Sequence, residues 1–246
     1  MLRPSTPDLR RDQVLWTLGQ ALLVTASVYL YFRIRHLTEG SHEVAVAHAR
    51  DLVALEQRLG IAVEEALQEP FLGSGLLATA ANSVYIYGHW PVITLVMLWT
   101  VWRHRAVFQR LRDAMIVSGL VGMVVFAAYP LAPPRLAHDG VVDTITREND
   151  AYRVLQPPQL TNQYAALPSL HAGWDLLVGI AVVTAAGTAW LRAVGWLLPV
   201  LMTISVVVTG NHYLLDVVAG LALALVGHAA ALRLERLRHR RRPAPS

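Results

Sequence analysis

The 246-residue chain contains no cysteine, so disulfide bonds, thiolate metal sites and cysteine nucleophiles are excluded. Lysine is also absent: all 21 basic side chains are arginines, and a cation that binds phosphate must be a guanidinium or a histidine. Charged residues make up only 15% of the chain, whereas hydrophobic residues make up 54% and mean hydropathy is +0.41. This composition predicts a membrane protein. Its richness in alanine and arginine also suggests a GC-rich bacterial genome.

Long apolar stretches recur along the chain, and each is close to the roughly 20 residues that a membrane-spanning helix needs. They predict an all-α, polytopic membrane protein with about six transmembrane helices in a single domain over 1–246. The first stretch is interpreted as a retained span, because no small-residue cleavage site follows Tyr31. The predicted spans are 14–32, 76–102, 114–131, 170–186, 191–208 and 213–232.

Three segments outside these spans are more polar. Residues 41–70 carry apolar side chains at helical spacing among charged ones, which predicts interfacial amphipathic helices broken near Gly60 and ended before Pro70. Residues 132–167 are rich in proline and charge and predict a polar loop. The arginine-rich segment 233–246 predicts a basic tail that is solvated or binds lipid headgroups.

The positions of the arginines predict the orientation of the chain in the membrane. Most lie before the first span, between the second and third spans and after the sixth, and positive charge favours the cytoplasmic side. Both termini are therefore predicted to be cytoplasmic, and the loop 132–167 extracytoplasmic. Because the arginines lie beside apolar segments rather than among aromatic residues, nucleic-acid binding is not expected.

His212 and Asp216 are four residues apart at the predicted start of the last span, which puts both on one helical face. Ionisable groups in or beside membrane helices are costly and call for a functional explanation. Asp216 could hold one ring nitrogen of His212 as a donor and leave the other as a nucleophile. A structural hydrogen bond between helices is the alternative.

Ser169 and His171 lie at the start of the fourth predicted span, on the same membrane face as His212. A helix start presents N–H groups suited to a phosphate. His171 could also be the acid that protonates a departing alkoxide. The alternative is that these residues only cap the helix or lie at the interface.

Further polar residues are predicted to face the same site. Arg135 follows two prolines at the exit of the third span, where its guanidinium could clamp phosphate oxygens or only anchor the helix at the interface. Asn82, Tyr85 and His89 are three and four residues apart and form one stripe on the second span. They could line a headgroup cavity or form hydrogen bonds between helices.

Around these residues, over roughly 82–220, the chain resembles the type 2 phosphatidic acid phosphatase superfamily. Its phosphatase signature reads K-x-x-x-x-x-x-R-P, then P-S-G-H, then S-R-x-x-x-x-x-H-x-x-x-D. The chain matches the arginine of the first motif with Arg135. The matching residues of the second and third motifs are Pro168, Ser169, His171, Ser205, His212 and Asp216.

The chain also departs from the phosphatase signature. Leu170 replaces the glycine of the second motif, and Leu136 replaces the proline of the first. Two cations are missing, because Ala128 stands at the lysine position and Val206 at the arginine position. The Ala-Pro-Pro-Arg, Pro-Ser-Leu-His and Gly-Asn-His-Tyr-Leu-Leu-Asp forms of the motifs resemble more closely the inositolphosphotransferase-like branch, related to inositol phosphorylceramide synthases, whose diester substrates carry less charge.

The resemblance implies a role for each matched residue. His212 would attack phosphorus and form a phosphohistidine, Asp216 would orient His212, and His171 would protonate the leaving group and later deprotonate the acceptor. No metal or other cofactor is implied. The phosphate oxygens would be bound by Arg135 and by the N–H groups near Ser169 and Asn211.

Three functions remain open from the sequence. The first is a phosphotransferase that moves a phosphoryl group or phospho-headgroup from a membrane lipid to an alcohol. The second is a lipid phosphate or prenyl (di)phosphate phosphatase that uses water as the acceptor. The third is a transporter or scaffold in which His171, His212 and Asp216 form a polar relay.

Overall fold

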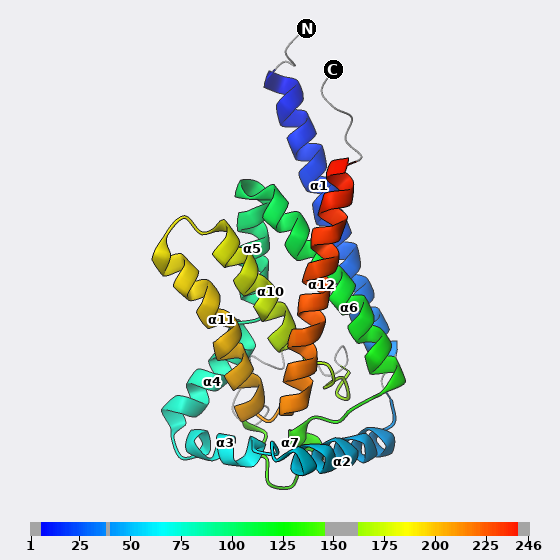
Figure 1. Cartoon of the computed structure of the whole chain (residues 1–246), viewed down its shortest axis with the longest axis vertical. Coiled ribbons are helices and arrows are strands. Elements are labelled where there is room, and N and C mark those ends of the chain that lie inside the picture. The colour runs from blue at the N-terminus through cyan, green and yellow to red at the C-terminus, as the bar shows by residue number, and fades with distance from the viewer. Residues whose placement is uncertain (1–5, 38–39, 146–161, 241–246) are drawn as a thin grey trace.

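The computed structural model describes residues 6–37, 40–145 and 162–240, and these regions are built of helices. Long helices form a bundle, and α2, α3 and α7 lie at the end of the bundle opposite to the two chain termini (Figure 1). The helices are α1 (Thr6–Leu37), α2 (His42–Leu59), α3 (Glu64–Leu72), α4 (Gly75–Tyr87), α5 (Trp90–Arg103), α6 (Arg105–Ala128), α7 (Pro134–Ala137), α10 (Leu170–Ala185), α11 (Ala189–Val208) and α12 (Leu214–Arg240).

The structure is that of a multi-pass, all-α membrane protein. In the described part of the chain, α6, α11, α12 and the segment Gln13–Ile34 of α1 are each long and apolar enough to cross a membrane. The pair α4 and α5 makes a fifth candidate, bent by 46° at its break. The predicted span 76–102 is therefore two helices, and Pro91 in the first turn of α5 suits a new helix start. The helix α10 is apolar but has only 16 residues, so its status as a sixth span stays a prediction.

Several helices run past the boundaries that the sequence suggested: α1 and α6 begin earlier than the predicted spans, and α3 and α12 end later than predicted. The helix α12 continues to Arg240, so the predicted basic tail begins as helix, and 241–246 lies outside the described residues. Pro70 lies inside α3 rather than beyond its end, and a proline in that position removes one intrahelical hydrogen bond without ending the helix. Residues 146–161 of the predicted polar loop also lie outside the described residues.

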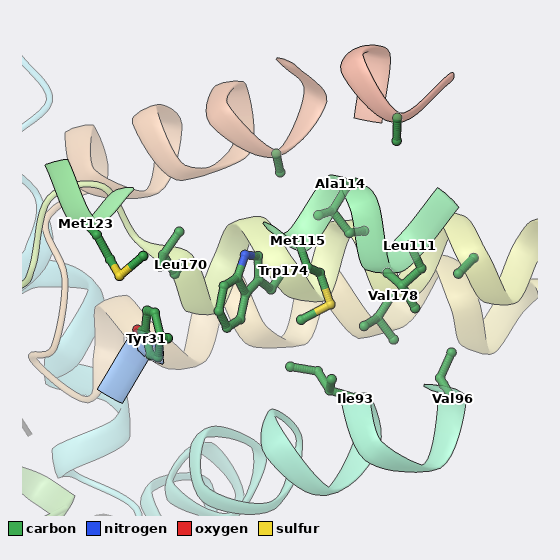
Figure 2. Packing of buried hydrophobic residues seen from close by; sticks show 14 of the residues in the cluster. Tyr31, Ile93, Val96, Leu111, Ala114, Met115, Met123, Leu170, Trp174 and Val178 are labelled. Carbon is green, nitrogen blue, oxygen red and sulfur yellow. The ribbon is translucent and has the colours of Figure 1, made fainter. Parts of the chain in front are cut away.

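A buried apolar cluster joins α1, α5, α6 and α10. Figure 2 shows the Trp174 indole beside Leu170 and Met115, and the Tyr31 ring centroid lies 5.4 Å from that of Trp174. The indole N–H donates to the Ser118 hydroxyl at 3.1 Å, so the polar atom of this large side chain is satisfied in the core. The contact fixes α10 against α6.

Charged contacts hold α6 against α12 at the end of the bundle that carries the termini. Arg110 donates to both oxygens of Glu235, at 3.0 and 3.2 Å. Asp113 accepts from Arg238 at 2.5 Å and from its neighbour Arg112 at 2.6 Å. Such bidentate and shared contacts are stronger than single surface ion pairs.

The helix α2 packs one stripe onto the opposite end of the bundle. Its buried residues Ala45, Ala49, Leu52 and Glu56 recur at spacings of four, three and four, as one face of a helix requires. The Ser41 hydroxyl accepts from the Val44 N–H at its start. As predicted, the helix stops at Gly60, whose φ of 70° is left-handed.

Candidate active site

The starts of α10 and α12 bring two histidines together at the end of the bundle opposite to the chain termini. The ring centroids of His171 and His212 are 5.9 Å apart, and the side chains are buried, with exposed fractions of 8% and 5%. The two residues are far apart in the sequence, so only the packing of α10 on α12 creates this pair. At this separation both rings can contact one phosphate group.

A carboxylate lies behind the ring of His212. The Asp216 Oδ2 is 3.5 Å from the His212 Nδ1 and accepts from the Tyr213 backbone N–H at 3.0 Å. This contact is longer than a normal hydrogen bond, and contacts of this kind commonly tighten in the complex with substrate. Because Asp216 faces Nδ1, the other ring nitrogen, Nε2, is left for chemistry.

The two helix starts touch through their backbones. The Ser169 N–H donates to the Asp216 carbonyl at 2.9 Å. A β-carbon on Gly220 would lie only 2.1 Å from the Ser169 carbonyl oxygen, so no larger residue fits there without moving α10. The absence of a side chain at Gly220 therefore sets how closely His171 approaches His212.

A tight turn between α11 and α12 places His212. Gly210 adopts a left-handed φ of 72°, which a residue with a side chain rarely does. The N–H groups of Asn211 and His212 both donate to the Val206 carbonyl, at 3.1 and 3.0 Å. The Asn211 amide also donates to the Thr209 hydroxyl at 2.9 Å. These contacts fix the backbone of the turn.

Arg135 lies against this turn from α7. Its Nε donates to the Asn211 Oδ1 at 3.1 Å, and its backbone N–H donates to the Gly210 carbonyl at 2.9 Å. A second guanidinium nitrogen is 3.4 Å from an Asp143 carboxylate oxygen. The predicted first motif therefore meets the predicted third motif in space.

The N–H groups of Ser169 and Asn211 themselves donate to backbone carbonyls of the chain, so they are engaged within the fold. The Ser169 hydroxyl accepts from the Ala172 N–H at 3.4 Å, as a helix cap does. Near Ser169, the first-turn N–H groups of α10 belong to Leu170 and His171, and N–H groups at a helix start point in the direction from which an oxygen ligand could approach.

The three residues of the predicted second-span stripe have different partners. Asn82 donates to the Thr144 carbonyl at 3.1 Å and accepts from the Thr144 hydroxyl at 2.9 Å. The Tyr85 ring stacks on His171, with centroids 4.7 Å apart. His89 lies 2.6 Å from an Asp175 carboxylate oxygen, and its ring centroid is 4.3 Å from that of His171.

Two buried glutamates that are not among the predicted site residues hold the start of α12. The Glu56 Oε1 accepts from the Leu215 N–H at 2.8 Å, and the Glu64 Oε1 accepts from the Leu214 N–H at 2.9 Å. Acids suit a helix N-terminus, where backbone N–H groups are unpaired. Burial raises the pKa of Glu56 to about 8, and the nearby charge of Glu64 acts in the same direction.

For two residues that the sequence analysis did not select as site residues, Glu56 and Asp175, the sequence contains a pattern that could have identified them. Glu56 lies four residues after Leu52, on the apolar stripe of its helix, where an acid is unexpected. Asp175 lies four residues after His171 inside an apolar run, in the same H-x-x-x-D spacing as His212 and Asp216. A carboxylate at either position costs free energy unless it has a partner.

An apolar cavity of about 250 Å³ lies beside the site, between α1, α5, α6 and α10. Trp90 and Trp174 line it, and the rings of both also lie against His89, with centroids 5.3 and 6.1 Å away. Val28 and Leu30 line it from α1. The cavity is thus one aromatic layer away from the histidine cluster.

Within the described ranges, no group of three or more histidine or acidic side chains is arranged to hold a metal ion. Comparison with known proteins gives one family: a sequence model described as the PAP2 superfamily matches residues 50–230. No curated protein and no solved structure matches the chain.

Proposed function

This chain belongs to the PAP2 superfamily, and from that premise we propose that it is an integral membrane phosphotransferase with a phosphohistidine intermediate. Membership suggests lipid phosphatase or phosphotransferase activity, and members are typically metal-independent phosphatases with a histidine nucleophile. The substrate in this proposal is a phospholipid or lipid-linked phosphate, and the acceptor is an alcohol. The observation that carries the proposal is the pair of buried imidazoles 5.9 Å apart, one with a carboxylate behind it.

In the first half of the proposed reaction, the Nε2 of His212 attacks phosphorus. The bond from phosphorus to the lipid alkoxide breaks, and His171 gives that alkoxide its proton. Asp216 stabilises the positive charge that develops on the His212 ring. Arg135 and the first-turn N–H groups of α10 would stabilise the phosphate oxygens.

The second half reverses these roles. His171, now neutral, takes the proton of the acceptor hydroxyl, and the acceptor oxygen attacks the phosphohistidine. The bond between phosphorus and His212 breaks, which returns both imidazoles to their starting states. No proton is gained or lost by the site over the whole cycle.

The missing cations favour a diester substrate over a phosphomonoester. Val206, at the arginine position of the phosphatase signature, is fully buried and packs in an apolar cluster with Met202 and Val217. Ala128, at the lysine position, is the last residue of α6. Fewer cations suit a singly charged diester better than a doubly charged monoester.

The proposal places the site at the extracytoplasmic face and both termini in the cytoplasm. Its support is that Arg110 and Arg238 lie at the last turns of α12, at the end of the bundle where α1 begins and α12 ends, whereas the first turn of α10, with His171, and the turn just before α12, with His212, lie toward the other end (Figure 1). The helices α2 and α3 would then lie along the outer membrane surface.

The acceptor is tested with the purified protein in detergent and a phospholipid labelled in its headgroup phosphate. We expect transfer of the label to an added lipid alcohol, with loss of transfer in His212→Ala and retention in His104→Ala, which changes a histidine between α5 and α6. Release of free phosphate or free phospho-headgroup at a rate that does not depend on the added alcohol would favour the phosphatase alternative. The typical activity of the superfamily supports that alternative. If the protein yields neither a transfer product nor a hydrolysis product from any phospholipid or prenyl phosphate, both the transferase and the phosphatase proposals are wrong.

A further inference from the structure

A second histidine–aspartate pair lies behind His171, on the side of α5. The His89 Nδ1 is 2.6 Å from the Asp175 Oδ2, and the exposed fractions of the two side chains are only 3% and 1%. Removing a carboxylate from water is costly, and its attraction to a partner repays that cost only when the geometry is good. Ionisable groups within a membrane bundle therefore call for a functional explanation, and neither His89 nor Asp175 takes part in a step of the proposed reaction.

The position of the pair relative to His171 is specific. His89 lies at the break between α4 and α5, where the bent span brings its ring within 4.3 Å of the His171 ring, measured between centroids. Tyr85, one turn earlier, stacks on His171 at 4.7 Å. Asp175 lies one turn after His171 on α10, so it anchors His89 from the same helix that carries His171.

Each imidazole of the site thus has a carboxylate near it. Asp216 lies directly behind His212, and Asp175 contacts His89, whose ring packs against His171. A 2.6 Å contact to a carboxylate fixes which nitrogen of His89 faces Asp175 and restricts rotation of its ring. A fixed His89 in turn restricts the ring that packs against it.

We propose that His89 and Asp175 are positioning residues that hold His171 in the orientation from which it protonates the leaving group. This rests on the proposed function, in which His171 is the general acid. His89 is then not a headgroup ligand, and the bend between α4 and α5 serves to deliver its ring to the site. A misplacement of about 1 Å in a catalytic group can cost about 10²-fold in rate.

The test uses two phosphodiesters that differ only in the leaving group, an alkyl alcohol in one and nitrophenol in the other. Single-turnover release of the alcohol or of nitrophenol isolates the first half of the reaction. A nitrophenolate leaves without a proton, so it does not need His171, whereas an alkoxide does. We expect Asp175→Asn to slow alcohol release by about 10- to 100-fold and nitrophenol release by less than about threefold. His89→Asn, which keeps an N–H near the position of Nδ1, should lose less than His89→Ala.

A purely structural role gives a different result. Damage to the fold lowers the rates of alcohol release and nitrophenol release by the same factor. Both rates are measured on one preparation, so partial unfolding leaves their ratio unchanged. Equal losses would overturn the proposal. The proposal would also be overturned if the double variant His171→Ala with Asp175→Asn released alcohol more slowly than His171→Ala alone. A residue that only positions the His171 ring has no effect once that ring is removed.

The same experiment separates this proposal from the one on which it rests. If His171→Ala shows no dependence on the leaving group, the assignment of His171 as the acid is wrong. If His171→Ala shows that dependence and Asp175→Asn does not, only the positioning role is wrong.

Discussion

The contact between Gly220 and Ser169 gives a prediction whose size follows from the structure. A β-carbon at residue 220 would lie 2.1 Å from the Ser169 carbonyl oxygen and 2.8 Å from its carbonyl carbon. Both neighbours are backbone atoms, so no side-chain rotation relieves the clash. The start of α10 must therefore move away from α12 by roughly 1 Å to restore van der Waals separation.

That movement also affects the hydrogen bond from the Ser169 N–H to the Asp216 carbonyl. Its length is 2.9 Å, and an added displacement of roughly 1 Å takes it beyond a normal hydrogen bond. We expect overpacking of this kind to cost about 1–3 kcal/mol in stability. The effect on turnover should be larger, about 10²-fold, because His171 moves relative to His212.

The assay compares turnover and thermal unfolding in detergent for Gly220→Ala, Gly19→Ala and the wild type. Gly19 is a matched control, since it also lies in a long helix but has no atoms within 4 Å of its hypothetical β-carbon. Gly220→Ala should unfold a few degrees lower and be nearly inactive, whereas Gly19→Ala should resemble the wild type. Turnover of Gly220→Ala within about twofold of wild type would refute the argument that this close approach sets the geometry of the site.

Three further outcomes follow from the structure. His171→Ala should lower turnover of an alkyl ester by about 10²–10⁴-fold without loss of the fold, checked by steady-state kinetics and unfolding; a near-normal rate would contradict its role as the acid. The stability provided by protonated Glu56, whose pKa rises from 4.5 to about 8 on folding, should be lost progressively as pH rises through that range, and Glu56→Gln should remove this dependence in pH-resolved unfolding. We also expect the apolar cavity beside the site to hold a hydrocarbon chain of the substrate, so Val28→Trp, which fills this cavity from α1, should raise KM for a long-chain lipid more than for a short-chain analogue; an equal change in both KM values would contradict this.

The part of the site that the sequence predicted depends on short-range patterns. His212 and Asp216 are four residues apart, so a helix alone puts them on one face. Apolar runs predicted the helices. Because successive spans cross the membrane in opposite directions, the fourth and sixth predicted spans start on the same side, which put His171 and His212 at one end of the bundle. The multi-pass helical fold was therefore predictable, and it is confirmed.

The remaining contacts depend on tertiary packing, which spacing along the chain does not encode. Asp175 meets His89 across 86 residues, and Glu56 meets the Leu215 N–H across 159. The break at His89 turns one predicted span into two helices, and only that bend brings His89 to His171. Such pairs follow from how helices pack, so the sequence suggested the residue types but not their partners.

The most direct test of the central claim is the trapping of radiophosphate on the protein during turnover of a labelled phospholipid. Quenched wild-type protein should carry an acid-labile label that peptide mapping assigns to His212, and His104→Ala should carry it as well. His212→Ala should carry none. An unlabelled wild type that turns over its substrate, or a label that persists in His212→Ala, would contradict attack by this imidazole on phosphorus.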